Sequence, residues 1–284
     1  MSEVPRFSII TPAYNASTTL AETVASVRAQ TFGEWELLIV DDGSTDSTRA
    51  LAEGLAAEDP RIRVSSQENR GPGGAYNTGV RAARSEWMVM LSADDLLLPP
   101  HLATLDAFLN VHADADVVTV GGFYGHPDGR RVLATPEAAW ADPAGSTLAE
   151  LLRECYYGVG AAYRKSVFDT VGGYREDTYS EDYLFWLLAR AHGFTHLHIR
   201  EPLTVHRRSA TQMSANAVAM RENDVRVIEL LIESGMLSED DMAAARASVA
   251  RLRRNIRIRK AAAALLGAKA ERLIAGLRRV GRSD

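Results

Sequence analysis

The chain has 284 residues, of which 46% are hydrophobic and 24% charged, and its formal net charge at pH 7 is −5. This composition excludes a collagen, a disulfide-rich scaffold and a wholly disordered chain, and it predicts a globular protein of one large domain or one domain with an appendage. The single cysteine, Cys155, excludes an intrachain disulfide, and no apolar run reaches the roughly 18 residues that span a bilayer, so we expect a cytoplasmic protein.

Short β-rich runs alternate with helical patterns in the first part of the chain. In order, the sequence predicts strands at 7–11, 35–40, 61–65, 87–91 and 116–120, and helices at 17–30, 46–58, 74–83 and 102–111. This alternation is typical of an α/β fold in which helices flank a Rossmann-like, mostly parallel sheet.

The regular pattern fails at 121–145, where Pro127, Asp128 and Gly129 form a turn signal suited to a hairpin. We interpret this segment as an insertion at the rim of a site. Order returns with an apolar run at 159–163 and with helices at 165–170 and 181–192.

The end of the chain has a helical pattern at 216–281, with a break near Ser234 and Gly235. From Arg246 onward there are twelve basic and two acidic residues, a net charge of +10, so the rest of the chain carries −15. Such an uneven distribution predicts different partners for the two parts. Three interpretations of the basic helices stay open: docking on the acidic body, peripheral contact with the inner face of a membrane, and self-association.

Polar residues follow three of the predicted strands at the point where each ends. They are Thr11-Pro12-Ala13-Tyr14-Asn15, Asp41-Asp42-Gly43-Ser44 and Ser92-Ala93-Asp94-Asp95. Ligands of open α/β sheets bind beyond the carboxyl ends of the strands, so we expect one crevice with four carboxylates. Each acidic pair alone is also typical of a turn or a helix cap. Two such pairs at strand ends favour a site that holds a cation or a hydrogen-bonding ligand.

Five motifs in order carry a resemblance to a known family. They are Ser8-Ile9-Ile10-Thr11-Pro12-Ala13-Tyr14-Asn15, Val40-Asp41-Asp42-Gly43-Ser44-Thr45-Asp46, Asn69-Arg70-Gly71, Asn77-Thr78-Gly79 and Leu91-Ser92-Ala93-Asp94-Asp95. Together they resemble the family 2 glycosyltransferases of GT-A fold, over about 7–214. The first strand is followed by no G-x-G-x-x-G, which disfavours a dinucleotide-binding dehydrogenase.

The resemblance implies a GT-A domain at 1–214, with a nucleotide-sugar half at about 1–120 and an acceptor half at about 121–214, before a basic helical appendage at 215–284. A carboxylate suits the N3–H of a pyrimidine, so Asp41 or Asp42 is expected to bind the base of a UDP- or dTDP-linked sugar. The donor-binding residues that the resemblance implies are Thr11, Pro12, Ala13, Tyr14, Asp41, Asp42, Asn69, Gly74, Asn77, Ser92, Ala93, Asp94 and Arg207.

The resemblance also implies a metal cofactor, Mg²⁺ or Mn²⁺, on the diphosphate of the donor. Asp94 corresponds to the last carboxylate of the family's D-x-D motif, whereas Ser92 stands where the family usually has Asp. Asp95 or water is then expected to complete the metal's ligands, and His206 is a further candidate. Weaker metal binding is the expectation, and loss of metal dependence is the alternative.

The segment from Tyr179 to Trp186 resembles the family's E-D motif at the start of a helix. The second acid, Asp182, is expected to deprotonate the acceptor, although an acidic pair at a helix N-terminus also suits a capping role. Gly172, Gly173 and Tyr174 resemble the acceptor-side loop of the family, and Trp186 is expected in the core.

These expectations combine into an inverting glycosyltransferase that moves a sugar from a nucleotide diphosphate to an acceptor hydroxyl or amine. A glycan, a lipid-linked sugar and a natural product all remain candidate acceptors, and no nucleic acid partner is expected. Two alternatives stay open: a non-catalytic nucleotide-sugar binding protein and a sugar-phosphate nucleotidyltransferase. The second would normally have a Gly-rich, basic loop after the first strand, which this chain lacks.

Overall fold

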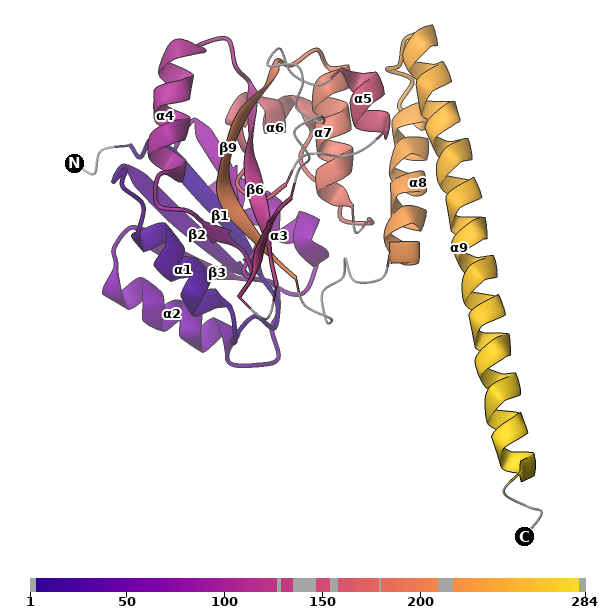
Figure 1. Ribbon diagram of the computed structural model, residues 1–284. Helices are drawn as coiled ribbons and strands as arrows, with labels where there is room; N and C mark the ends of the chain where they lie inside the picture. The colour runs from indigo at the N-terminus through magenta and orange to yellow at the C-terminus, as the bar shows by residue number, and fades with distance from the viewer. Residues whose placement is uncertain are drawn as a thin grey trace.

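The computed structural model describes residues 4–126, 129–134, 147–153, 158–178, 180–208 and 217–280. Figure 1 shows a central twisted sheet with helices on both faces and a helical pair at one side. The strands are β1 (Phe7–Ala13), β2 (Trp35–Asp41), β3 (Ile62–Ser66), β4 (Trp87–Met90), β5 (Leu96–Leu97), β6 (Val117–Gly125), β7 (Arg131–Leu133), β8 (Ala162–Arg164) and β9 (His196–Arg207). The helices are α1 (Leu20–Arg28), α2 (Thr48–Glu58), α3 (Gly71–Ala82), α4 (His101–Val111), α5 (Leu148–Arg153), α6 (Lys165–Val171), α7 (Glu181–Ala191), α8 (Ala217–Glu233) and α9 (Glu239–Val280).

The sheet has the strand order β3-β2-β1-β4-β8-β6-β9-β5, with β7 paired to β6. The longer ladders are parallel: β1 pairs with β2 and β4, β2 with β3, and β6 with β9. In these ladders Ala13 lies opposite Asp41, and Ile10 opposite Met90. The carboxyl ends of β1, β2 and β4 therefore meet at one edge of the sheet, which confirms the predicted α/β architecture.

Two apolar layers cover the sheet, because successive side chains of a strand point to opposite faces. Ile9, Leu37 and Val89 pack on the face covered by α1, α2 and α4. Ile10 and Met88 pack on the other face, with residues of α3, α5, α6, α7, α8 and α9. Trp186 belongs to this second layer and is 1% exposed, as the sequence predicts.

The structure differs from the expected pattern at β6 and β9. The strand predicted at 116–120 continues to Gly125, and it forms the predicted hairpin with β7, whose turn residues Pro127 and Asp128 lie outside the described residues. Strand β9 was not predicted, because Pro202 interrupts its apolar pattern. The β6 and β9 ladder shifts register on either side of Gly121, where a Cβ would lie 2.7 Å from the Arg200 carbonyl oxygen. This irregularity accommodates the proline.

The C-terminal helices pack on the body of the protein. Gly235, with a φ of 71°, ends the turn after α8, so the predicted break is confirmed. Val227, Leu231, Val249 and Leu252 share one apolar cluster with α7, and Figure 1 shows α9 running beside α8 and then continuing past it. Among the described residues, no helix is both long and apolar enough to cross a membrane.

The packing of α3 on β1 predicts opposite effects of two glycine-to-alanine substitutions. A Cβ at Gly79 would lie 2.4 Å from Ile10 Cγ2, whereas Gly54 in α2 is exposed and has no atom within 4 Å of its Cβ position. Gly79→Ala should lower the free energy of unfolding by about 1–3 kcal/mol through overpacking. Gly54→Ala should raise it by about 0.5–1 kcal/mol, since it removes only unfolded-state freedom. Urea unfolding of both variants checks the signs, and a neutral Gly79→Ala contradicts the close packing.

Candidate active site

The ends of β1 and β2 are joined to each other by backbone and side-chain hydrogen bonds. The N–H of Asp42 donates to the Ala13 carbonyl oxygen (2.9 Å), and the N–H of Thr45 donates to Asn15 Oδ1 (2.9 Å). Of the predicted donor-binding residues here, Thr11 and Ala13 are buried and Pro12 is partly buried, while Tyr14 is 52% exposed. Tyr14 is therefore available to a ligand at this edge.

The two carboxylates after β2 have different surroundings, although both are buried. Asp42 Oδ1 accepts hydrogen bonds from Gln67 Nε2 (2.7 Å) and from the N–H of Arg70 (2.9 Å). Asp41 Oδ1 accepts a longer hydrogen bond from the N–H of Ser44 (3.3 Å). Asp42 thus holds the segment that leads into α3. Asp41 is the better placed of the two to bind the nucleobase of a donor.

The start of α3 carries three predicted donor-binding residues with different environments. Asn69 is exposed, and a Cβ at Gly74 would lie 2.5 Å from Arg70 Cβ, so this turn is tightly packed. Asn77 is buried and bonds the Tyr174 backbone twice, donating to its carbonyl oxygen (2.9 Å) and accepting from its N–H (2.8 Å). The structure therefore gives Asn77 a role that the resemblance did not imply: it attaches the loop that contains Tyr174 to α3.

Ser92 faces Tyr76, a residue that the sequence reasoning did not single out. Burial raises the pKa of Tyr76 well above its ordinary value, the charges of Glu181 and Asp182 add to this, and a hydrogen bond with Ser92 opposes it. The Tyr76 hydroxyl is therefore a protonated group between the loop after β4 and the start of α7. Its ring packs against Tyr174, with the ring centroids 5.1 Å apart.

The loop after β4 is bonded to the end of β9. Asp95 is buried, and its Oδ1 accepts the N–H of Arg207 (2.9 Å) while its Oδ2 lies 3.2 Å from His206 Nδ1. Burial lowers the pKa of His206, but the hydrogen bond and charge of Asp95 outweigh it, so the net shift is upward. Asp94 is only partly buried, next to this pair.

This arrangement suits a divalent ion held by Asp94 and by Nε2 of His206. Histidine ligands of metals commonly bond a carboxylate through the other ring nitrogen, as His206 does with Asp95. Each oxygen of Asp95 has one partner within the protein and a second lone pair, so Asp95 stays a candidate ligand behind Asp94. Within the described ranges no three Asp, Glu, His or Cys side chains form a complete metal site. The donor's diphosphate and water would supply the other ligands.

The expected base, Asp182, lies in the first turn of α7. Its Oδ1 accepts the N–H of Tyr183 (2.7 Å). Burial raises the pKa of Asp182, the charge of Asp224 adds to the rise, and His206 opposes it. The neighbouring Glu181 is buried, and burial followed by the charge of Asp182 raises its pKa well above the ordinary value. The start of α7 lies against α3, because a Cβ at Gly73 would be 3.4 Å from the Cβ of Glu181.

Helix α8 contributes a residue that the sequence reasoning missed. Asp224 forms an ion pair with Arg221 (3.0 Å), and burial raises its pKa while Arg221, Ser180 and Arg251 oppose the rise. No motif marks Asp224, and only the packing of α8 on α7 brings it to the base. Tyr179 and residues 209–214, which belong to the resembling segments, lie outside the described residues.

The polar residues of the candidate site lie at the ends of β1 and β2, in the loop after β4, at the end of β9 and in the first turn of α7. The sequence model of glycosyl transferase family 2 matches residues 8–172, more than half of the chain. The chain belongs to glycosyl transferase family 2. The match ends before Asp182, His206 and Arg207, so the roles of these three residues rest on the structure and on the resemblance.

Two curated relatives illustrate the similarity in sequence. The succinoglycan biosynthesis protein ExoO of Rhizobium meliloti is 40% identical over 103 residues, which cover 36% of this chain and 29% of the relative. The glycosyltransferase GlyG of Streptococcus pneumoniae is 34% identical over 129 residues, which cover 45% of this chain and 42% of the relative. The chain therefore spans less than half the length of each.

Solved structures show the same fold at low sequence identity. TarS 1–349 of S. aureus in complex with UDP-GlcNAc has a TM-score of 0.71 and 22% identity, over 87% of this chain and 71% of that one. The mannosyltransferase PcManGT of Pyrobaculum calidifontis, in complex with GDP-Man and Mn²⁺, has a TM-score of 0.66 and 18% identity, over 94% and 81%. The predicted family and GT-A fold are confirmed.

Proposed function

We propose that the protein transfers a sugar from a nucleotide diphosphate to an acceptor, with inversion at the anomeric carbon. The observation that carries this proposal is the contact between the start of α7 and the start of α3. A Cβ at Gly73 would lie 3.4 Å from the Cβ of Glu181, next to the expected base Asp182, and the N–H of Arg70 in the same part of the structure donates to Asp42. The expected base thus lies near the expected donor-binding edge, which favours an enzyme over a protein that only binds nucleotide sugars.

The donor is expected at the edge formed by β1, β2 and the start of α3. Asp41 accepts a hydrogen bond from the nucleobase of the donor, and the exposed ring of Tyr14 lies beside the same loops. TarS and PcManGT are named as complexes with UDP-GlcNAc and GDP-Man, which supports a nucleotide sugar as the donor class. The pyrimidine preference, UDP or dTDP, rests on the acceptor-only chemistry of a carboxylate.

Asp94 and His206 are the residues that would hold Mg²⁺ or Mn²⁺. A bound divalent ion neutralises the charge that develops on the leaving nucleoside diphosphate. Asp95 orients His206 through Nδ1. Ser92 supplies no negative charge to the site, because its hydroxyl is neutral where the family usually has a carboxylate. The complex of PcManGT with Mn²⁺ supports this choice of ion.

Asp182 takes the proton of the acceptor hydroxyl or amine as that group attacks the sugar. A single base opposite the leaving group is the arrangement of a one-step, inverting displacement. The acceptor then enters past the loop of Gly173 and Tyr174, which Asn77 holds in place. A cytoplasmic location, and peripheral membrane contact or self-association through the basic end of α9, remain part of the proposal.

Removal of the base separates chemistry from donor binding. Asp182→Asn should lower the transfer rate by roughly 10²- to 10⁴-fold, because a positioned general base is lost. Binding of the nucleoside diphosphate should change little, since Asp182 acts on the acceptor. Single-turnover assays with radiolabelled donor, run beside calorimetry, measure both quantities. Transfer at nearly the wild-type rate would show that another group is the base.

Substitution of Asp94, the proposed metal ligand, should weaken donor binding, which substitution of Asp182 leaves nearly unchanged. Asp94→Ala should weaken binding of the nucleoside diphosphate in the presence of Mn²⁺ by at least about 10-fold and should flatten the dependence of activity on Mn²⁺. Asp114→Ala, which removes an exposed carboxylate in the turn after α4, is the matched control and should change neither quantity. A Mn²⁺ titration that Asp94→Ala leaves unchanged would contradict this assignment.

The charge of Asp224 predicts a shift in the pH profile. The base works deprotonated, so kcat/KM rises as the pH passes through the raised pKa of Asp182, above the ordinary aspartate value of about 3.9. Asp224→Asn removes a negative charge and frees Arg221, so the acid limb should move to lower pH. Glu222→Gln is the control, because Glu222 pairs with Lys260 instead. An acid limb that stays in place or rises would contradict the coupling.

A further inference from the structure

Arg207, the last residue of β9, joins three separate parts of the structure. Its backbone N–H donates to Asp95 Oδ1 (2.9 Å), and its Nε donates to the carbonyl oxygen of Asp94. A single residue thus holds both members of the acidic pair that follows β4. The donors on the far side of the guanidinium reach α1.

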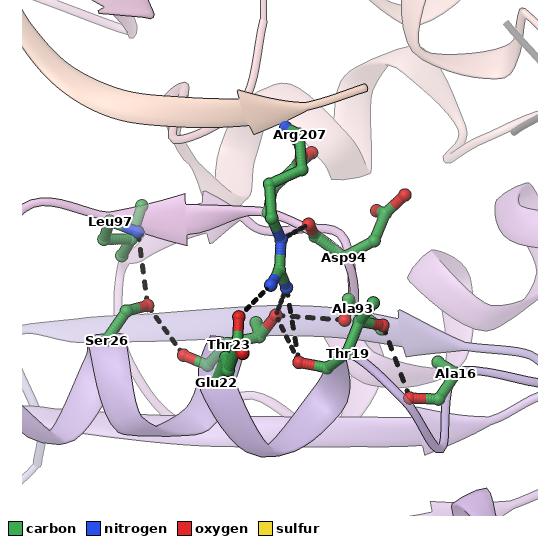
Figure 2. Close-up of polar contacts among 10 residues, drawn as sticks. Ala16, Thr19, Glu22, Thr23, Ser26, Ala93, Asp94, Leu97 and Arg207 are labelled. Carbon is green, nitrogen blue, oxygen red and sulfur yellow. Dashed lines mark hydrogen bonds and ion pairs between the residues drawn. The ribbon is translucent and has the colours of Figure 1, made fainter. Parts of the chain in front are cut away.

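Figure 2 shows this second set of contacts. Nη1 of Arg207 pairs with the carboxylate of Glu22, and Nη2 donates to the Thr19 carbonyl oxygen (3.3 Å) and to Thr23 Oγ1 (3.2 Å). The Thr23 hydroxyl in turn donates to the Ala93 carbonyl oxygen (2.9 Å). The loop that carries Asp94 is therefore fastened to α1 at Ala93 and, through Arg207, at Asp94.

The direction of the Arg207 side chain argues against a direct contact with the donor. In Figure 2 the guanidinium points toward α1, whereas the carboxylate of Asp94 points away from it. The planar fork of an arginine can bond several acceptors in fixed directions, and here those acceptors are protein oxygens. The donor-binding role implied for Arg207 by the resemblance therefore gives way to a structural one.

We infer that Arg207 is a positioning residue which, with Thr23, holds the backbone at Asp94 so that the carboxylate faces the metal and diphosphate. The inference rests on the proposed function of Asp94. Groups behind a metal ligand typically change metal affinity or activity by about 10- to 100-fold when removed. A displacement of about 1 Å at such a site is enough for losses of this size.

Two variants test this role without removing Asp94. Arg207→Lys keeps the charge but loses the fork, and Thr23→Val keeps the buried shape but loses the hydroxyl. Calorimetry measures the affinity for UDP or GDP, whichever the wild-type protein binds, once with Mn²⁺ and once with EDTA. In both variants the ratio of the affinity with Mn²⁺ to the affinity in EDTA should be about 10- to 100-fold smaller than in the wild-type protein. Their affinity in EDTA should stay at the wild-type level.

Arg28→Lys is the matched control. Arg28 lies on the same helix α1 and also bonds a carboxylate, of Glu58 (2.9 Å), and a backbone carbonyl, of Leu55 (2.7 Å), but it joins α1 to α2. It should keep the full gain from Mn²⁺, which separates positioning from a general loss of stability.

Three results would overturn the inference. The first is that Arg207→Lys, but not Thr23→Val, loses as much affinity for the nucleoside diphosphate in EDTA as it loses with Mn²⁺. This would mean that Arg207 binds phosphate directly. A full Mn²⁺ gain in both variants would mean that the Asp94 loop needs no such attachment. A wild-type protein that gains nothing from Mn²⁺ would contradict the proposed metal site itself, and the inference with it.

Discussion

The buried carboxylate of Asp95 is the interaction on which the site depends. It accepts a hydrogen bond from the backbone N–H of Arg207 and bonds the imidazole of His206, so the end of β9 is held against the loop after β4. Strand β9 reaches this point because it pairs with β6 across an irregular register at Gly121. This contact places His206 and Arg207 beside Asp94 and Asp95. The carboxylate of Asp95 therefore joins β9 to the loop after β4, as the side chain of Asn77 joins α3 to Tyr174.

The polar residues around this contact form two sets: residues that bond the protein's own backbone, and residues that we propose to act on ligands. Asp42, Asn77, Asp95 and Arg207 bond the protein's own backbone. Buried polar groups need such partners, and a carboxylate with several donors is costly to move. The carbonyl oxygen of Asp94 accepts from Arg207, Nδ1 of His206 bonds Asp95, and Oδ1 of Asp182 accepts from Tyr183. These contacts fix the positions of the groups that we propose to act on the cation and the acceptor.

Much of the nucleotide half could be predicted from the sequence, because its signals are local. Strands β1, β2 and β4 end at Ala13, Asp41 and Met90, within two residues of the ends predicted from apolar runs that stop at polar residues. The start of α7 at Glu181 follows from its acidic first turn. Strand β9 could not be predicted, since Pro202 breaks its pattern and only pairing with β6 compensates. The roles of Asn77 and Arg207 depend on partners about 100 or more residues away. Such contacts leave no periodic signal.

The most direct test of the central claim, that metal, diphosphate and base meet at the end of β9, is the NMR spectrum of the histidine side chains during addition of Mn²⁺ with UDP or GDP. Paramagnetic broadening falls steeply with distance from the ion. The imidazole of His206 should broaden first, while His112, which follows α4 at the opposite edge of the sheet, should broaden last. A His206 signal that stays sharp while Mn²⁺ and nucleotide bind would contradict the claim.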